Sequence, residues 1–139
     1  MKRIMVFLLF VTMFSVAGCT RQKIQVALMT KLESGSIVGS SEVNAARLFL
    51  EDNDIDYIEV TPFDDAWDPA KALQAYADIR SRGINILVTS HVSTCAVALA
   101  EPVNRDGVLT LVTGATTDRL TGQDDFIIRN VQDVSQEQK

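Results

Sequence analysis

The sequence contains few of the residues that bind metal ions or form disulfides. Among 139 residues there are 2 cysteines and 1 histidine, and Cys19 and Cys95 stand far apart in the chain. Zinc sites and redox motifs need pairs of cysteine or histidine at short spacings. We therefore expect no metal site and no cofactor.

Basic residues are also scarce. Lys and Arg together number 13 against 18 Asp and Glu, which gives a net charge of −5 at pH 7. Proteins that bind nucleic acid neutralise its phosphates with clustered Lys and Arg. Nucleic acid is therefore not an expected partner.

The sequence lacks the short motifs of common enzymes. It has no glycine-rich phosphate loop and no dinucleotide-binding fingerprint. The sole histidine, His91, has no nucleophile and acid at separations that would indicate a catalytic triad. We interpret His91 as a loop or core-edge residue and predict that the protein is not an enzyme.

The amino terminus has the pattern of a secretion signal. Lys2 and Arg3 precede the apolar run 4–14, and small residues follow up to Cys19. The segment Val16-Ala17-Gly18-Cys19 resembles the lipobox of bacterial lipoproteins. An ordinary transmembrane anchor is the alternative, but the apolar run is shorter than the roughly 20 residues that a span needs.

The lipobox resemblance implies three segments and a location. Residues 1–18 would be a signal peptide, Cys19 would carry lipid such as palmitate, and residues 19–23 would tether residues 24–139 to a membrane. The protein would then face the periplasm or the exterior as a lipoprotein of the cell envelope. Thr20 does not resemble the aspartate that retains lipoproteins in an inner membrane, so the outer membrane is favoured if there are two.

Removal of the predicted signal peptide would change the net charge, and lipidation of Cys19 would leave one free cysteine. Without Lys2 and Arg3 the net charge becomes −7. With Cys19 lipidated, Cys95 has no partner for a disulfide. Cys95 stands among apolar residues at the start of a predicted helix, and we interpret it as a buried structural thiol rather than a reactive one.

Strand-like and helix-like segments alternate along the rest of the chain. Apolar runs predict five strands, at residues 24–29, 55–60, 84–88, 108–112 and 126–128. Helical spacing predicts three helices, at about 40–53, 68–83 and 95–103. This order predicts an α/β fold of three layers, with a mostly parallel sheet and helices on both faces. Residues 55–60 alternate in polarity, which favours a place near the edge of the sheet.

Local signals set the expected limits of these elements. Ser40 or Ser41 would cap the first helix. The inward face of this helix would consist of Val43, Ala46, Leu48, Phe49 and Leu50. Thr61-Pro62 would end the second strand. Asp68-Pro69 would start the second helix, and its inward positions would be Ala70, Leu73, Ala77 and Ile79. The carboxylates of Asp64, Asp65 and Asp68 could suggest a cation site, but capping and solvation explain them better.

Polar residues come directly after two of the predicted strands, 84–88 and 108–112. The segments 89–94 and 113–117 contain mostly Ser, Thr and Gly and come directly after apolar runs. At the carboxyl end of a parallel strand, backbone N–H groups and hydroxyls converge and bind small anionic groups. We therefore expect part of a ligand site there.

The residues resemble one family, the type I periplasmic binding proteins, and in particular the branched-chain amino-acid (Leu/Ile/Val) receptors of ABC importers. The similarity runs from Lys23 to about Gln136. Four pieces carry it, in order: the opening strand and loop with Gly39 and Asn44-Ala45-Ala46-Arg47, then DDAWDPAKALQAYADIRSRGINILV, SHVST and TGATTDRLT.

The resemblance implies where a ligand would bind. A hydroxyl and main-chain amides that hold the ligand's carboxylate map onto Ser93 and Thr94. The loop that contacts the ligand's amino and carboxyl groups maps onto Gly114, Ala115 and Thr116. Val38 stands where some family members place an aromatic side chain over the ligand.

The resemblance also implies a function. We expect a lipid-anchored solute-binding protein, or its amino-terminal lobe, that binds an amino-acid-like ligand and serves an ABC permease. Family members continue through a second lobe that closes over the ligand, so the 139 residues would form an incomplete amino-terminal lobe with exposed apolar surface. Two alternatives stay open: an envelope lipoprotein of the same fold that regulates other proteins, and a degenerate half-receptor without transport function.

Overall fold

The computed structural model describes residues 22–33, 36–89, 92–122, 125–132 and 134. The predicted signal peptide (residues 1–18), Cys19 and His91 lie outside the described residues. Within them the chain forms, in order, β1 (Ile24–Thr30), α2 (Ile37–Asp52), β2 (Ile58–Asp64), α3 (Pro69–Ser81), β3 (Ile86–Thr89), α4 (Ser93–Asp106), β4 (Leu109–Val112), the 3₁₀ turn η2 (Asp118–Leu120) and β5 (Ile127–Arg129).

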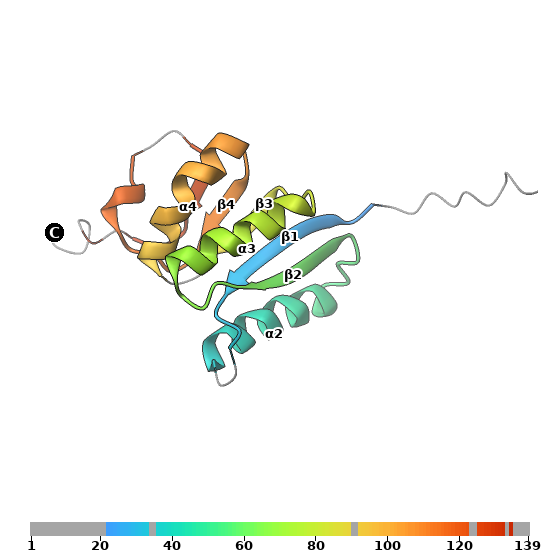
Figure 1. Cartoon of the computed structure of the whole chain (residues 1–139). Helices are drawn as coiled ribbons and strands as arrows, with labels where there is room; N and C mark the ends of the chain where they lie inside the picture. The colour runs from blue at the N-terminus through green and yellow to red at the C-terminus, as the bar shows by residue number, and fades with distance from the viewer. Residues whose placement is uncertain (1–21, 34–35, 90–91, 123–124, 133, 135–139) are drawn as a thin grey trace, which may run out of the picture.

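The strands form one parallel sheet in the order β2-β1-β3-β4-β5. The chain moves outward from β1 to β2 and then returns past β1 to β3. Right-handed crossovers place the helix of the first connection on one face and the helices of the next two on the other. Accordingly α2 packs against β1 and β2, while α3 and α4 pack against each other and cover the opposite face (Figure 1). The predicted α/β class with helices on both faces is confirmed.

The main core lies between the sheet and the α3–α4 pair. Ala27 and Met29 of β1 and Leu87 of β3 point to this side, in register with one another. They meet the fully buried helix residues Ile79, Leu99 and Val103. On the α2 side, β3, β4 and β5 carry an aliphatic face that is only partly covered: Ile86, Val88, Leu109, Leu111 and Ile128. This face is an exposed apolar surface; that a second lobe would cover it stays a prediction.

The limits of α3 follow the sequence signals closely. Asp68 is the N-cap and accepts a hydrogen bond from the Lys71 N–H, Pro69 is the first helical residue, and Gly83 follows the helix with a φ of +73°. The predicted inward face was right only at Ile79, however, since Ala70, Leu73 and Ala77 are exposed. Ala72, Tyr76 and Ile79 are buried, whereas Leu73 is 42% exposed. The buried face of α3 is the one that contains Tyr76, because the Tyr76 hydroxyl hydrogen-bonds to Pro102 and Asp106 of α4.

Helix α2 begins earlier than predicted. Its N-cap is Ser36, which accepts a hydrogen bond from the Gly39 N–H. Ser40 and Ser41 lie inside the helix, where their hydroxyls donate to carbonyl oxygens one turn back instead of capping. Leu48 and Phe49 are exposed, so their predicted place on the inward face was wrong. The face turned to the sheet contains Val43, Ala46 and Leu50, which are half-buried.

Strand β2 is an edge strand, as predicted, but its predicted end at Thr61-Pro62 was wrong. The N–H of Ile24 donates to the Tyr57 oxygen, and the N–H of Asp65 donates to the Thr30 oxygen. This alternation turns the backbone groups of Ile58, Val60, Pro62 and Asp64 away from β1. Pro62 therefore sits where no ladder donor is needed, and the strand continues through it.

Other limits shift as well, including the start of β2, which is Ile58 rather than Ile55, and the start of β4, which is Leu109 rather than Val108. Strand β3 begins at Ile86 rather than Ile84, and β5 spans Ile127–Arg129. Helix α4 is longer than predicted at both ends and takes in Ser93 and Thr94. It continues through Pro102 to a left-handed Gly107 at its C-cap, where φ is 66°. In the part of the chain that the structure describes, we find no helix with the length and apolarity to cross a membrane.

Candidate ligand-binding site at the carboxyl edge of the sheet

The order of the strands creates a natural binding edge. The chain reverses direction across the sheet between β1 and β3, because β1 leads to α2 on one face and β3 leads to α4 on the other. In open α/β sheets, ligands bind outside the carboxyl ends of the strands at such a switch point. The described residues of the two polar segments, 89, 92–94 and 113–117, lie at this edge.

Ser93 and Thr94 form the first turn of α4 rather than part of a loop. The N-cap, Val92, has no side chain that could accept a hydrogen bond from the first-turn N–H groups. The amino end of this helix therefore combines two hydroxyls with a partial positive charge. That combination suits a small anion.

Ser93 and Thr94 line a shallow hollow of about 250 Å³. The hollow lies between the start of α4 and the loop that leads into η2. Its lining consists of Ser93, Thr94, Val97, Ala98, Thr117 and Arg119. A guanidinium group and three hydroxyls thus stand around one small volume, next to an apolar wall.

The loop after β4 is held firmly in place. The N–H and the hydroxyl of Thr113 both donate to the Thr89 oxygen, over 3.1 and 3.3 Å, which joins the ends of β3 and β4. From β5, Arg129 donates to the Thr117 oxygen and to the Thr121 hydroxyl. Thr117 in turn accepts from the Arg119 N–H over 3.3 Å. This network fixes the wall of the hollow that carries Arg119.

The structure brings together only some of the residues that the resemblance implies. Ser93 and Thr94 share the hollow, but Gly114, Ala115, Thr116 and Val38 do not line it. Ala115 is fully buried and packs against Ala96 and Val112, so only its backbone could contact a ligand. Gly114 and Thr116 are half-buried along the same loop, and the Thr116 oxygen accepts from the Val134 N–H.

Val38 lies apart from the hollow. It belongs to the first turn of α2, on the other face of the sheet, and is 38% exposed.

The sequence placed Thr117 in the polar segment expected at the site, but it did not single out Arg119. Arg119 lies two residues beyond that segment and is the first basic residue after β4. The sequence does contain one indication of an anion site: Arg119 comes closely after the threonine-rich segment that follows β4. The missing information was the 3₁₀ turn, which places Thr117 and Arg119 beside α4.

A buried carboxylate lies close to the same edge. Asp65 is 1% exposed, and its Oδ1 accepts from the Trp67 N–H over 3.0 Å. Burial raises its pKa above the ordinary aspartate value, and the charges of Asp64 and Glu42 act in the same direction. The sequence-based interpretation of capping holds for Asp68, but Asp65 is not a solvated surface group.

Cys95 is the buried thiol that the sequence predicts. It is 1% exposed in the first turn of α4. Burial is the main cause that raises its pKa to about 11, and the nearby Asp65 charge adds to the rise. A thiol with so little thiolate at neutral pH is a poor nucleophile. Among the described residues, no group of three or more potential metal ligands comes together.

No protein-family profile and no curated protein sequence matches this chain. Solved structures do. A solute-binding protein of an ABC transporter from Rhodopseudomonas palustris BisB5, in complex with 3,4-dihydroxybenzoic acid, matches with a TM-score of 0.69 at 21% identity over 82% of this chain and 33% of that one.

Two further solved structures of transporter binding proteins have a similar fold. An ABC-type branched-chain amino acid transporter protein from Rhodopseudomonas palustris CGA009 has a TM-score of 0.68 at 18% identity, over 82% of this chain and 34% of its own. A substrate-binding protein of a branched-chain amino acid transporter from Streptococcus pneumoniae, in complex with isoleucine, has a TM-score of 0.68 at 21% identity, over 81% and 34%. The chain therefore has the fold of the periplasmic solute-binding proteins of ABC transporters and spans about a third of the length of these neighbours.

Proposed function

We propose that the chain is part or all of a lipid-anchored, extracytoplasmic solute-binding protein that binds a small carboxylate, such as an amino acid, and serves an ABC permease. The carboxylate would lie in the hollow between the start of α4 and Arg119. The hydroxyls of Ser93 and Thr94 and the first-turn N–H groups of α4 would hold its oxygens.

One observation supports this above all: the hollow joins a helix amino end, hydroxyls and a guanidinium at the carboxyl edge of a parallel sheet. Each of these favours an anion, and a guanidinium can meet both oxygens of a carboxylate. The apolar side of the hollow, Val97 and Ala98, would face the carbon skeleton of the ligand.

The ligands of the structural neighbours are consistent with this choice. One neighbour was solved with 3,4-dihydroxybenzoic acid and another with isoleucine. Both compounds carry a carboxyl group, although their remaining parts differ. We propose that the carboxyl group is the shared feature that this edge recognises.

The membrane anchor and the location rest on the sequence. The lipobox Val16 to Cys19 supports lipidation of Cys19, and an outer membrane is favoured where there are two. The described chain begins at Gln22, close to β1 at the amino edge of the sheet, so an anchor at Cys19 would leave the binding edge at the opposite end from the membrane.

The experiment is a titration of the full chain, purified in a mild detergent, with isoleucine, other amino acids and benzoates. The matched controls are the amides of the same compounds, which lack the carboxylate charge. We expect binding in the millimolar range or weaker, because the hollow is shallow and open to water, and we expect the amides to bind less. Equal binding of acid and amide, or no binding, would contradict the proposal and would favour the protein-interaction role.

A further inference from the structure

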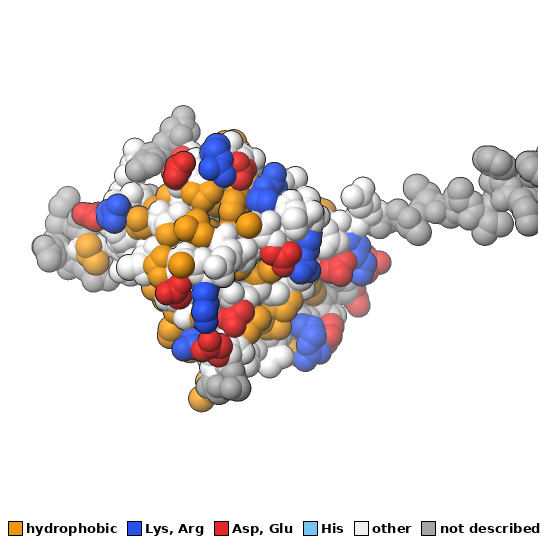
Figure 2. All heavy atoms as spheres, viewed as in Figure 1, with side chains coloured by type: hydrophobic (Ala, Val, Ile, Leu, Met, Phe, Trp, Pro, Cys, Tyr) orange, Lys and Arg blue, Asp and Glu red, His pale blue; other side chains and the backbone are white. Residues whose placement is uncertain are grey.

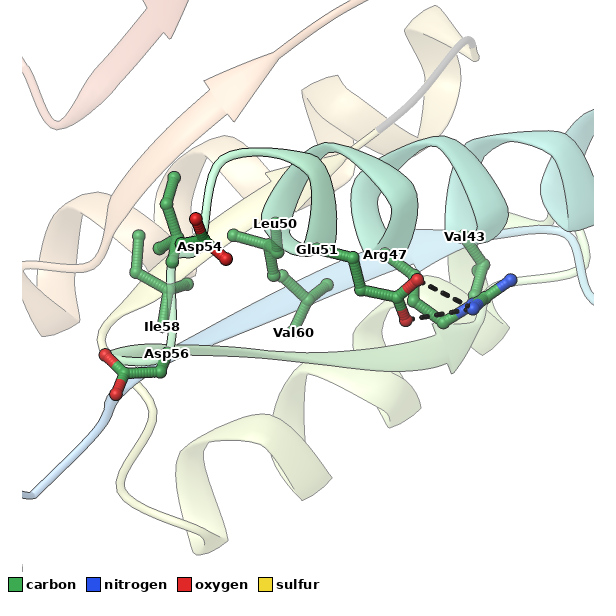
Figure 3. A pocket seen from close by; sticks show the side chains of 9 residues that line it. Val43, Arg47, Leu50, Glu51, Asp54, Asp56, Ile58 and Val60 are labelled. Carbon is green, nitrogen blue, oxygen red and sulfur yellow. Dashed lines mark hydrogen bonds and ion pairs between the residues drawn. The ribbon is translucent and has the colours of Figure 1, made fainter.

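A second hollow lies away from the binding edge, between α2 and the free edge of β2. It has a volume of about 600 Å³ and an aliphatic floor of Val43, Leu50, Ile55, Ile58 and Val60. Figure 3 shows Val43, Leu50, Ile58 and Val60 pointing into the space between the helix and the strand, with charged groups around them. We call this space the α2–β2 groove.

The charges around the groove are unbalanced. Arg47 and Glu51 pair with each other over 2.9 Å along the helix. Asp54 and Asp56 lie at the other end, and neither carboxylate makes a hydrogen bond or ion pair within the described part of the chain. The lining therefore carries a net charge of −2, concentrated at the end where β2 begins.

The strand beside the groove has free backbone groups at the same place. The N–H and carbonyl groups of Ile58 and Val60 point away from β1, toward the open edge. Their side chains form part of the groove floor. An extended segment that pairs with this edge would therefore lay every second side chain into the groove.

We propose that the α2–β2 groove docks an extended segment of a partner protein that carries aliphatic side chains at alternate positions and Lys or Arg at one end. The segment adds a sixth strand beside β2, its aliphatic side chains cover the groove floor, and its basic end meets Asp54 and Asp56. Pro62 limits the pairing to the first half of β2, because it offers no N–H to the edge. The docked segment is therefore short.

Figure 2 shows apolar side chains between α2 and β2 and also over α3 and α4, with charged groups along both borders, so the charges decide between the two surfaces. A second groove between α3 and α4 has a balanced rim of Arg80, Arg105, Glu101 and Asp106. Arg105 and Asp106 pair with each other there, so that rim gives no reason to favour a partner of either charge.

The test uses a blocked octapeptide with Lys at one end, Lys-Lys-Val-Thr-Val-Thr-Val-Thr, and the full chain labelled with ¹⁵N in a mild detergent. A peptide with Glu in place of Lys is the control for charge. We expect amide shifts at Ile58, Val60 and the facing side of α2, with a dissociation constant below about 1 mM that rises with salt. The Glu peptide should not bind.

Two pairs of variants separate specific docking from general attraction to an acidic protein. Asp54→Asn with Asp56→Asn should weaken binding about twofold to tenfold, as expected for two exposed ion pairs. Asp52→Asn with Asp118→Asn removes the same charge outside the groove and should leave binding unchanged. Equal weakening by both pairs would overturn the proposal.

A third variant tests the proposed backbone pairing between the docked segment and β2. Val60→Pro removes an outward N–H but no ladder donor to β1, so the fold should persist and peptide binding should be lost. Binding that survives in a folded Val60→Pro variant would overturn the proposal. So would equal affinity for hexylammonium, which would indicate a small-molecule site, or shifts at Ile58 and Val60 on dilution without peptide, which would indicate pairing between copies of the chain.

Discussion

The hydroxyl of Tyr76 on α3 donates a hydrogen bond to Oδ2 of Asp106 at the carboxyl end of α4, over 3.0 Å. It also lies 3.2 Å from the Pro102 oxygen. A carboxylate at a helix carboxyl end is unfavourable on its own, because it meets the negative end of the helix dipole. Arg105 and Tyr76 offset this, and together they lower the pKa of Asp106 below its ordinary value. The contact joins the two helices that cover the main core.

Tyr76→Phe should destabilise the fold by about 1 to 2 kcal/mol, because it removes a buried hydroxyl that donates to a carboxylate. The loss should depend on pH. A lowered folded-state pKa stabilises the fold above the ordinary aspartate value of 3.8, and this stabilisation disappears as the pH falls through the lowered value. Urea unfolding of both proteins at neutral pH and near pH 3 should show the smaller difference in acid. A constant difference would show that the Tyr76 hydroxyl does not act on the Asp106 charge.

Ile79→Ala and Leu73→Ala test which stripe of α3 faces the core. Ile79 is fully buried and Leu73 is 42% exposed on the same helix. The Ile79 variant should lose about 2 to 5 kcal/mol of unfolding free energy, whereas the Leu73 variant should lose less than about 1 kcal/mol. Thermal or urea melts of the two variants give the comparison, and similar losses would contradict the packing of α3.

The sequence predicted the elements of the fold better than their faces. Asp68-Pro69 and Gly83 set α3 through backbone chemistry that acts locally, and this is visible in the sequence. The choice between Leu73 and Tyr76 as the inward residue depends on what α4 presents to α3, which no local pattern contains. Likewise Pro62 stops a strand only if its nitrogen faces a partner, and that depends on the register between β1 and β2.

Gly39→Ala should destabilise the protein although alanine favours helices. A Cβ at Gly39 would lie 1.9 Å from the backbone oxygen of Lys31, the residue that follows β1. Moving α2 away from β1 should cost about 1 to 3 kcal/mol or more, which exceeds the gain of up to about 1 kcal/mol in helix propensity. Asn44→Ala, at an exposed position of the same helix, is the control and should be neutral or slightly stabilising. Gly39→Ala at wild-type stability would contradict the close approach of α2 to β1.

Lipidation of Cys19 is tested directly by mass spectrometry of the mature amino terminus. We expect a diacyl- or triacyl-cysteine as the first residue, because Val16 to Cys19 resembles a lipobox and follows a basic start. Cys19→Ser is the matched variant and should abolish the added mass. An intact Met1, or cleavage elsewhere without lipid, would contradict the prediction.

The candidate site was predictable as a place but not as a set of side chains. Polar residues after two apolar runs predicted the carboxyl ends of two strands, and Thr89 and Thr113 do lie together there. The sequence could not show that Ser93 and Thr94 continue into α4. Nor could it show that Ala115 packs against Ala96 and Val112, or that the 3₁₀ turn places Arg119 beside the hollow, because both depend on tertiary contacts.

The last prediction separates two positions for the ligand. If the carboxylate lies in the hollow, a hydrogen bond from the Ser93 hydroxyl to this charged group is worth about 1.5 to 3 kcal/mol in a receptor whose second lobe excludes water. Ser93→Ala should weaken binding about tenfold to a hundredfold in such a receptor, and by less in the open hollow of this chain. Thr116 does not line the hollow, so Thr116→Ala should change the affinity by less than about twofold.

Because millimolar binding leaves little range for weakening, the measurement is the carboxylate-dependent shift of the α4 first-turn amides in ¹⁵N spectra. These shifts should disappear in Ser93→Ala and persist in Thr116→Ala. Arg119→Gln, which removes the charge but keeps most of the length, should also reduce them, and it should do so less at high salt because screening already weakens the wild-type attraction. A larger effect of Thr116→Ala than of Ser93→Ala would place the ligand over the loop after β4, and an unchanged affinity in both would place it elsewhere on the chain.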